Sequence, residues 1–296
     1  MKILMIGGNG FIGKNLVKFL EGQQVQIYDI SPCLFQGNYE YIQGDFFDDI
    51  ELFKVVDEAD YIVHALSTMN PSNSNPKYLM GYSRDLIQTV KLCERVSKSR
   101  KGMLFLSSGG TVYGEQSIQP IPENAKLQPI NHYGNVKVAI ENAINVFNRH
   151  NHSNIRIARI SNPYGPGQNF EKGVGFIDAV LKKAMAGESI EIWGKGNIIR
   201  DYIYIDDVCN MLKAIIEYKG EENVFNVGTG VGTSQKSVID IVETLGLKAD
   251  VHYAEARDVD VQTSILDNRR IRALYHNELC GIEDGINKYY MYLNNN

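Results

Sequence analysis

A tyrosine and a lysine four residues apart, Tyr133 and Lys137, have the residue types and spacing for acid–base chemistry. On a helix, residues i and i+4 lie on the same face, so the lysine ammonium would lie near the tyrosine hydroxyl. A neighbouring positive charge favours the phenolate. Lowering a phenol pKa from about 10 to about 7 takes roughly 4 kcal/mol, which a lysine and a cationic ligand supply only in a dry site. The pair is therefore a catalytic candidate in which the lysine favours the tyrosine anion, and the alternative is a solvated helix face with an ordinary tyrosine.

Hydroxyl side chains gather in the segment Leu106–Gly114, which ends a predicted strand over 103–107. The carboxyl ends of parallel strands form the ligand crevice of an open α/β sheet. Ser108 and Thr111 are therefore candidates to contact a substrate oxygen and to assist catalysis. The alternative is a polar turn held by local side-chain to backbone hydrogen bonds.

Three glycines with the spacing G-x-x-G-x-x-G follow an apolar run over 2–6 and open an amphipathic stretch over 11–20. A strand, a glycine turn and a helix in this order place backbone N–H groups and the positive helix end against a pyrophosphate. A plain tight turn between strand and helix is the alternative. The cofactor-binding residues predicted at this turn are Gly7, Gly10, Phe11, Ile12 and Gly13.

Asp29 ends the second predicted strand, over 25–29. A carboxylate at this position accepts hydrogen bonds from the adenosine ribose hydroxyls and repels a 2′-phosphate. No arginine follows it closely, so NAD is favoured over NADP, and the alternative is an exposed aspartate at a strand end. Further residues predicted beside the dinucleotide are Asp45, Phe46, Ala65, Leu66 and Ser67.

Strands and helices alternate along the first half of the chain, which predicts a parallel sheet with helices on both faces. Strands are expected at 2–6, 25–29, 61–65, 103–107 and 154–160, with helices near 76–99 and 132–150. The predicted fold is α/β, a doubly wound parallel sheet of the Rossmann type with a smaller C-terminal substrate-binding lobe. Residues 1–160 would form the cofactor domain, to which 201–230 returns, and 161–296 would mainly form the second lobe.

Composition excludes several classes of protein. The 296 residues carry 30 basic and 35 acidic side chains, a net charge of −5, so no basic face for nucleic acid or an anionic membrane is expected. No apolar stretch approaches the roughly 18 residues of a membrane span. The four cysteines are far apart, which predicts reduced thiols in a cytoplasmic protein, and the six histidines match no metal-ligand pattern.

Taken together and in order, the motifs resemble those of the extended short-chain dehydrogenase/reductase family. Within that family the chain is similar to nucleotide-sugar epimerases of the UDP-hexose 4-epimerase type, over nearly its whole length. The motifs that carry the resemblance are Gly7–Gly13 (GGNGFIG), Ser107–Gly114, Tyr133 with Lys137, Arg159–Gly167 (RISNPYGPG), Trp193–Gly196, Arg200–Tyr204, Phe225–Gly228 and Arg257–Asp260.

The resemblance implies a role for each matching residue. Tyr133 would be the general base, with Lys137 as its electrostatic partner and a contact of the nicotinamide ribose. Arg200 and Arg257 would hold the substrate phosphates, a task suited to a planar guanidinium. Surface ion pairing is the alternative for the two arginines. The other substrate-binding residues implied are Asn162 at the diphosphate, Trp193 at the base, Asp260 at a ribose hydroxyl and Ser264 in the sugar pocket.

The chain departs from the family at Gly109, which stands where the family has its catalytic serine or threonine. A glycine cannot donate a proton, so Thr111 or Ser108 would replace that residue, and Thr111 is the preferred candidate. Gly110 and Thr111 stand where dehydratase relatives carry an Asp-Glu pair, which argues against 4,6-dehydration.

These observations predict an NAD-dependent isomerase that inverts C4 of a UDP-hexose or UDP-N-acetylhexosamine through a 4-keto intermediate. The small Ser264 favours room for an N-acetyl group. The resemblance also implies a homodimer. Two alternatives stay open: a nucleotide-keto-sugar reductase that uses its cofactor once, and a non-catalytic NAD-binding regulator.

Overall fold

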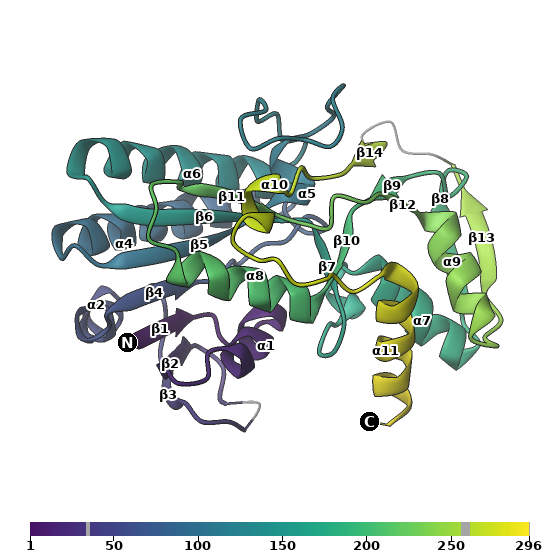
Figure 1. Ribbon diagram of the computed structural model, residues 1–296, viewed down its shortest axis with the longest axis horizontal. Helices are drawn as coiled ribbons and strands as arrows, with labels where there is room; N and C mark the ends of the chain where they lie inside the picture. The colour runs from purple at the N-terminus through teal and green to yellow at the C-terminus, as the bar shows by residue number, and fades with distance from the viewer. Residues whose placement is uncertain (34–35, 256–260, 296) are drawn as a thin grey trace.

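The computed structural model describes residues 1–33, 36–255 and 261–295, and its main feature is a seven-stranded parallel sheet (Figure 1). The strand order is β11-β6-β5-β4-β1-β2-β3, and every neighbouring pair is parallel. This confirms the predicted doubly wound α/β fold. The strands are β1 (Lys2–Ile6), β2 (Gln24–Asp29), β3 (Glu40–Gln43), β4 (Tyr61–His64), β5 (Gly102–Ser108), β6 (Asn154–Ile160) and β11 (Val224–Val227).

Helices cover both faces of this sheet, because its strands are apolar on both sides. Along β1, Ile3 and Met5 face one hydrophobic core and Leu4 and Ile6 face the other. The first core includes α1 (Phe11–Phe19) and α8 (Ile205–Glu217), and the second includes α2 (Asp49–Glu58), α4 (Ile87–Lys98) and α6 (His132–Asn151). Within the described ranges, no helix is long and apolar enough to cross a membrane.

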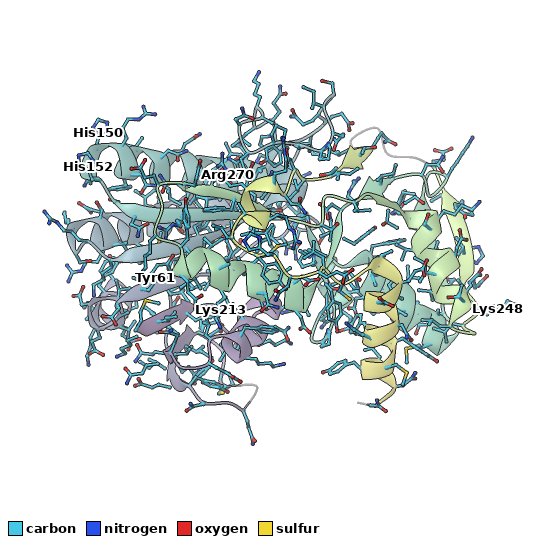
Figure 2. The ribbon with its side chains drawn as sticks, viewed as in Figure 1. Tyr61, His150, His152, Lys213, Lys248 and Arg270 are labelled. Atoms are coloured by element: carbon cyan, nitrogen blue, oxygen red, sulfur yellow. The ribbon has the colours of Figure 1, made fainter. Side chains whose placement is uncertain are left out.

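The helix α6 matters most for the site, and its start is set by a side chain. The Asn131 side chain accepts a hydrogen bond from the Gly134 amide, which satisfies one free N–H of the first turn. Tyr133 thus stands in the first turn, next to the carboxyl edge of the sheet. The closely spaced His150 and His152 lie at the opposite end of α6 (Figure 2).

A smaller lobe lies beside the carboxyl edge of the sheet, at the right of Figure 1. It contains α7 (Phe176–Ala186), α9 (Gln235–Thr244), α11 (Ile282–Asn294) and the parallel pair β8 (Ser189–Trp193) with β13 (Asp250–Ala254). Between the lobes, β9 (Ile199–Arg200) pairs with β12 (Thr233–Ser234) and β14 (Thr263–Ser264).

The segment predicted to return to the first lobe, 201–230, divides between two sheets. Its last strand, β11, lies at the edge of the large sheet beside β6, and α8 packs on that sheet. Its first strand, β10 (Tyr202–Tyr204), instead pairs with β7 (Asn162–Tyr164) in a separate two-stranded sheet.

Candidate active site

The glycine turn between β1 and α1 is packed so closely that side chains would not fit. Gly7 has φ +81°, a left-handed conformation, and a Cβ there would lie 2.9 Å from the Leu66 backbone. A Cβ at Gly13 would lie 2.8 Å from the Cα of Gly8. Gly10 is the N-cap of α1 and offers no side-chain cap, so the positive helix end faces outward uncovered. Phe11 and Ile12 form the first turn, and the arrangement fits a pyrophosphate.

Asp29 is held beside this turn at the end of β2. Its carboxylate accepts hydrogen bonds from the amides of Asn9 and Ser31, each at 3.1 Å, and the residue is 8% exposed. Because Asn9 lies within the glycine turn, these bonds fix the carboxylate against the phosphate cradle. This is the position that a dinucleotide's adenosine ribose requires.

Two neighbouring segments border the turn. The amide of Ala65 bonds to the Ile6 carbonyl, which continues the β1–β4 ladder and brings Leu66 against Gly7. Ser67 follows Leu66 and donates a hydrogen bond to Asp85. Asp45 accepts a hydrogen bond from the Phe47 amide. Phe46, in contrast, is buried, with its ring 4.9 Å from that of His64. Its side chain therefore packs in the core, and it also lines the pocket beside Lys137.

Lys137 and Tyr133 lie on one face of α6, above the end of β5. The Lys137 ammonium donates a 2.9 Å hydrogen bond to the Leu106 carbonyl and is buried. Its Nζ lies 5.6 Å from the centre of the Tyr133 ring and 4.6 Å from that of Phe105. The ammonium is thus anchored between the strand and the phenol.

Burial works against the charged form of both members of this pair. It raises the pKa of Tyr133 to about 12, a direction reinforced by the Asp85 carboxylate and opposed by a hydrogen bond with Ser108. Burial lowers the pKa of Lys137 to about 8, and the carboxylates of Asp85 and Glu141 oppose that shift. In the protein alone the phenol is therefore protonated, and additional positive charge is needed to make it a base near neutral pH.

Ser108, at the end of β5, is the hydroxyl that the structure brings to Tyr133. Thr111 lies in α5 (Gly109–Val112), and its Oγ1 is buried without a hydrogen-bond partner. The structure thus brings Ser108 to the phenol and leaves the Thr111 hydroxyl unpaired among the described residues, and which of the two assists catalysis stays a prediction. The position of Gly109 is closely packed, since a Cβ there would lie 2.5 Å from the end of the Leu266 side chain and 3.1 Å from the Arg159 carbonyl oxygen.

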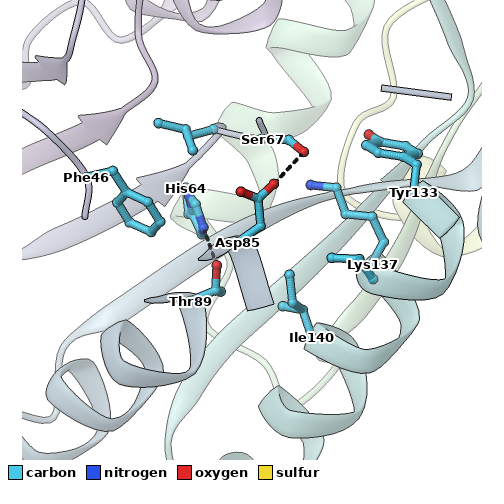
Figure 3. A pocket seen from close by; sticks show the side chains of 10 residues that line it. Phe46, His64, Ser67, Asp85, Thr89, Tyr133, Lys137 and Ile140 are labelled. Carbon is cyan, nitrogen blue, oxygen red and sulfur yellow. Dashed lines mark hydrogen bonds between the residues drawn. The ribbon is translucent and has the colours of Figure 1, made fainter. Parts of the chain in front are cut away.

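Two residues of this site have no signal in the sequence motifs: Asp85 and His64. Both line a pocket beside Lys137 (Figure 3). The His64 Nε2 lies 2.9 Å from the Thr89 hydroxyl, and burial lowers the pKa of the imidazole to about 3, so the ring is neutral. The lining residues are Phe46, His64, Leu66, Ser67, Asp85, Thr89, Tyr133, Val136, Lys137 and Ile140.

A buried ion pair connects α6, the helix that carries Tyr133 and Lys137, to the sheet. Arg159 on β6 contacts Glu141 on α6 at 2.7 Å, with side chains 5% and 1% exposed. The Ser107 hydroxyl donates to the same carboxylate at 2.5 Å. Glu141 lies one turn after Lys137, so the network fixes α6 against the two strands beneath it.

The predicted substrate residues lie between the lobes. Asn162 starts β7, where its amide and its side chain both donate to the Asp201 carbonyl. Arg200 and Ser264 are register partners on β9 and β14, and Ser264 is buried. Trp193 ends β8 and is 36% exposed, so it is not a core residue. The predicted Arg257 and Asp260 lie outside the described residues.

Comparison with known proteins identifies the family of the chain. Residues 3–228 match the NAD dependent epimerase/dehydratase family. The chain is 29% identical over 305 residues to a putative UDP-glucose 4-epimerase of Methanocaldococcus jannaschii, with 99% of each chain covered. It is 31% identical over 306 residues to a dTDP-4-dehydro-6-deoxyglucose reductase of Escherichia coli, with 97% of this chain and 95% of the other covered.

The crystal structure of the Thermotoga maritima UDP-glucose 4-epimerase with UDP-glucose aligns with this structure with a TM-score of 0.93 at 28% identity, over 100% of this chain and 99% of the other. The chain therefore belongs to the NAD dependent epimerase/dehydratase family, and NAD is its cofactor.

Proposed function

We propose that the protein inverts C4 of a UDP-hexose or UDP-N-acetylhexosamine through a 4-keto intermediate. The observation that carries the proposal is one cluster at the carboxyl edge of the sheet. There, Tyr133, its hydrogen-bond partner Ser108 and the buried Lys137 lie beside the strand ends that border the glycine turn. A base, a hydroxyl and a fixed positive charge are the groups needed to oxidise and re-reduce a secondary alcohol.

Each group of the chain has a distinct task in this scheme. NAD, when bound, supplies the site with a hydride acceptor that later returns the hydride. The glycine turn and Asp29 would hold the dinucleotide. Tyr133 would take the proton of the C4 hydroxyl, Ser108 would stabilise the phenolate through its hydrogen bond, and Lys137 would supply the positive charge. In the reverse direction Tyr133 would give a proton back to the C4 oxygen.

The substrate nucleotide would lie between the lobes. Arg200, together with Arg257, would pair with its phosphates, and Asn162 would contact the diphosphate. Trp193 would pack against the nucleobase, and Asp260 would accept a hydrogen bond from a ribose hydroxyl of the substrate nucleotide. The partly exposed indole of Trp193 and its place at a strand end support this assignment.

The small side chain of Ser264 leaves room for an N-acetyl group in the sugar pocket. A Ser264→Tyr variant should lose UDP-N-acetylhexosamine turnover and keep UDP-hexose turnover. Equal loss of both activities would contradict this substrate assignment.

A keto-sugar reductase is the second candidate, because the Escherichia coli relative carries that name. A reductase consumes one NADH or NADPH for each product, whereas an epimerase returns the hydride and shows no net consumption. The non-catalytic alternative is disfavoured because Ser108 supplies the hydroxyl that Gly109 lacks. A homodimer in the cytoplasm completes the proposal, and sedimentation equilibrium tests the dimer.

The experiment that tests the function uses purified protein with UDP-glucose and, separately, UDP-N-acetylglucosamine, followed by proton NMR. We expect the 4-epimer of at least one substrate. Tyr133→Phe should lower the rate by about 10²- to 10⁴-fold, the usual contribution of a general acid–base group. Tyr275→Phe, a change of the same kind outside the site, should leave the rate unchanged. No epimer with either substrate would contradict the proposal.

A further inference from the structure

Asp85 is a buried carboxylate whose oxygens are held by the turn that follows β4. The residue is 4% exposed. One oxygen accepts hydrogen bonds from the Ser67 hydroxyl at 3.0 Å and the Thr68 amide at 2.8 Å, and the other from the Thr68 hydroxyl at 2.7 Å. A carboxylate with three donors is fixed in place.

The backbone around Asp85 is also unusual. Residues Gly81–Leu86 form a π-helix directly before α4. Such widened turns are rare and occur often at functional sites. A Cβ at Gly81 would collide with Met69 and approach Val136 of α6, so this turn packs tightly between the β4 end and the catalytic helix. The π-helix thus presents Asp85 to the pocket that Tyr133 and Lys137 share (Figure 3).

The charged and titratable groups around Lys137 come from three elements. Asp85 faces it from the π-helix, Glu141 and Tyr133 from its own helix α6, and the neutral His64 from β4. Asp85 raises the pKa of Lys137 and of Tyr133, so it favours the ammonium and the neutral phenol. Since burial already lowers the pKa of Lys137 to about 8, loss of one nearby carboxylate would leave much of the lysine uncharged near neutral pH.

We propose that Asp85 is a positioning residue of the epimerisation: it keeps Lys137 charged and ties the π-helix that packs on α6 to the turn after β4 that borders the glycine turn. The inference rests on the proposed function. Asp85 acts through Lys137 and Tyr133 and need not touch the substrate. The lysine charge that favours the phenolate depends on this carboxylate, while the phenolate itself forms only when further positive charge offsets Asp85.

The first test needs no turnover and compares Asp85→Asn with wild type and Asp178→Asn. Asp178 is also fully buried, with hydrogen bonds from the Phe170 amide and the Tyr289 hydroxyl, but it lies in the other lobe. Urea unfolding of the protein as purified is followed between pH 6 and pH 10.5. In wild type the free energy of unfolding should begin to rise near pH 8, where folded Lys137 loses its proton before the unfolded chain does.

In Asp85→Asn this rise should begin about one pH unit lower, because the ammonium has lost its partner charge. Asp178→Asn should keep the wild-type onset even if it is less stable overall. An unchanged onset in Asp85→Asn would overturn the proposal. This comparison stands even if the protein epimerises none of the sugars tested, so the two proposals fail separately.

The second test is the pH profile of kcat for epimerisation. The acidic and the alkaline limb of this profile should both move to lower pH in Asp85→Asn, by about one unit. The reason is that the Asp85 carboxylate raises the pKa of Tyr133 and that of Lys137. The KM for substrate should stay within about twofold, since Asp85 acts through other residues. A uniform loss of rate with unmoved limbs would show a merely structural role and overturn the inference.

Discussion

The hydroxyl of Ser108, at the end of β5, forms a hydrogen bond with the phenol of Tyr133 in the first turn of α6. This hydrogen bond lowers the pKa of Tyr133, while burial and Asp85 both raise it. We therefore propose that Ser108, one position before Gly109, replaces the family's catalytic hydroxyl.

Replacement of Ser108 should be far more costly than replacement of Thr111. Ser108→Ala should lower kcat by about 10²-fold, because the phenolate loses its hydrogen-bond donor. Thr111→Val, with nearly the same volume, should lose less than about tenfold, since its hydroxyl has no partner. The rates come from the NMR assay with saturating substrate, and a larger loss in Thr111→Val would reverse the assignment.

Lys137 should make the stability of the protein depend on alkaline pH. Its pKa is about 8 when folded and 10.5 in a model peptide, so in that interval the unfolded chain binds more protons. The free energy of unfolding should therefore rise with pH, by up to about 3 kcal/mol, and fall back as pH drops through 8. Lys137→Met should remove this rise, whereas Lys248→Met, at an exposed lysine, should keep it. A rise that persists in Lys137→Met would assign it to another group.

The glycine turn at Gly7 can be tested against a matched control position, Gly246. Gly7 and Gly246 both have φ +81°, but a Cβ at Gly246 would meet no atom within 4 Å. Gly246→Ala should therefore cost only the strain of a left-handed alanine, about 1 to 2 kcal/mol. Gly7→Ala should cost more and also release NAD, measured as nucleotide retained after gel filtration. Equal stability and equal NAD content of the two variants would contradict the proposal that the glycine turn binds NAD.

The buried pair of Arg159 and Glu141 should show strong coupling. Arg159→Met leaves an uncompensated buried carboxylate, which should lower the free energy of unfolding by about 3 to 5 kcal/mol. The double variant Arg159→Met/Glu141→Leu should recover much of that loss. Urea unfolding of the two single variants and the double variant measures the coupling, and additive losses would show that the pair contributes no net interaction.

The features that depend on local sequence could be predicted. The apolar run of β1, the glycine turn and the first helix follow each other directly, and their spacing predicts both the strand–helix unit and its use. Tyr133 and Lys137 are also a local pattern, since a helix places i and i+4 on one face. The α/β fold follows from repetition of such units.

Other parts of the site depend on packing that no motif records. Asp85 lies in a polar stretch, and only the π-helix and the turn after β4 turn its carboxylate toward Lys137. The choice between Ser108 and Thr111 depends on packing in the same way, because Ser108 ends β5 and Thr111 lies three residues later in α5, and only the fold decides which hydroxyl meets Tyr133. The edge strand β3 is half exposed and shows no clear alternation, so its signal is weak.

The most direct test of the central claim is proton NMR of UDP-glucose incubated with the purified protein in D₂O, with no cofactor added. Transfer of hydride away from C4 and back predicts UDP-galactose whose C4 proton is retained, with no NADH accumulating. Tyr133→Phe should form it at least about 10²-fold more slowly. Deuterium at C4 of the product, or NADH consumed in proportion to product when it is supplied, would contradict the account.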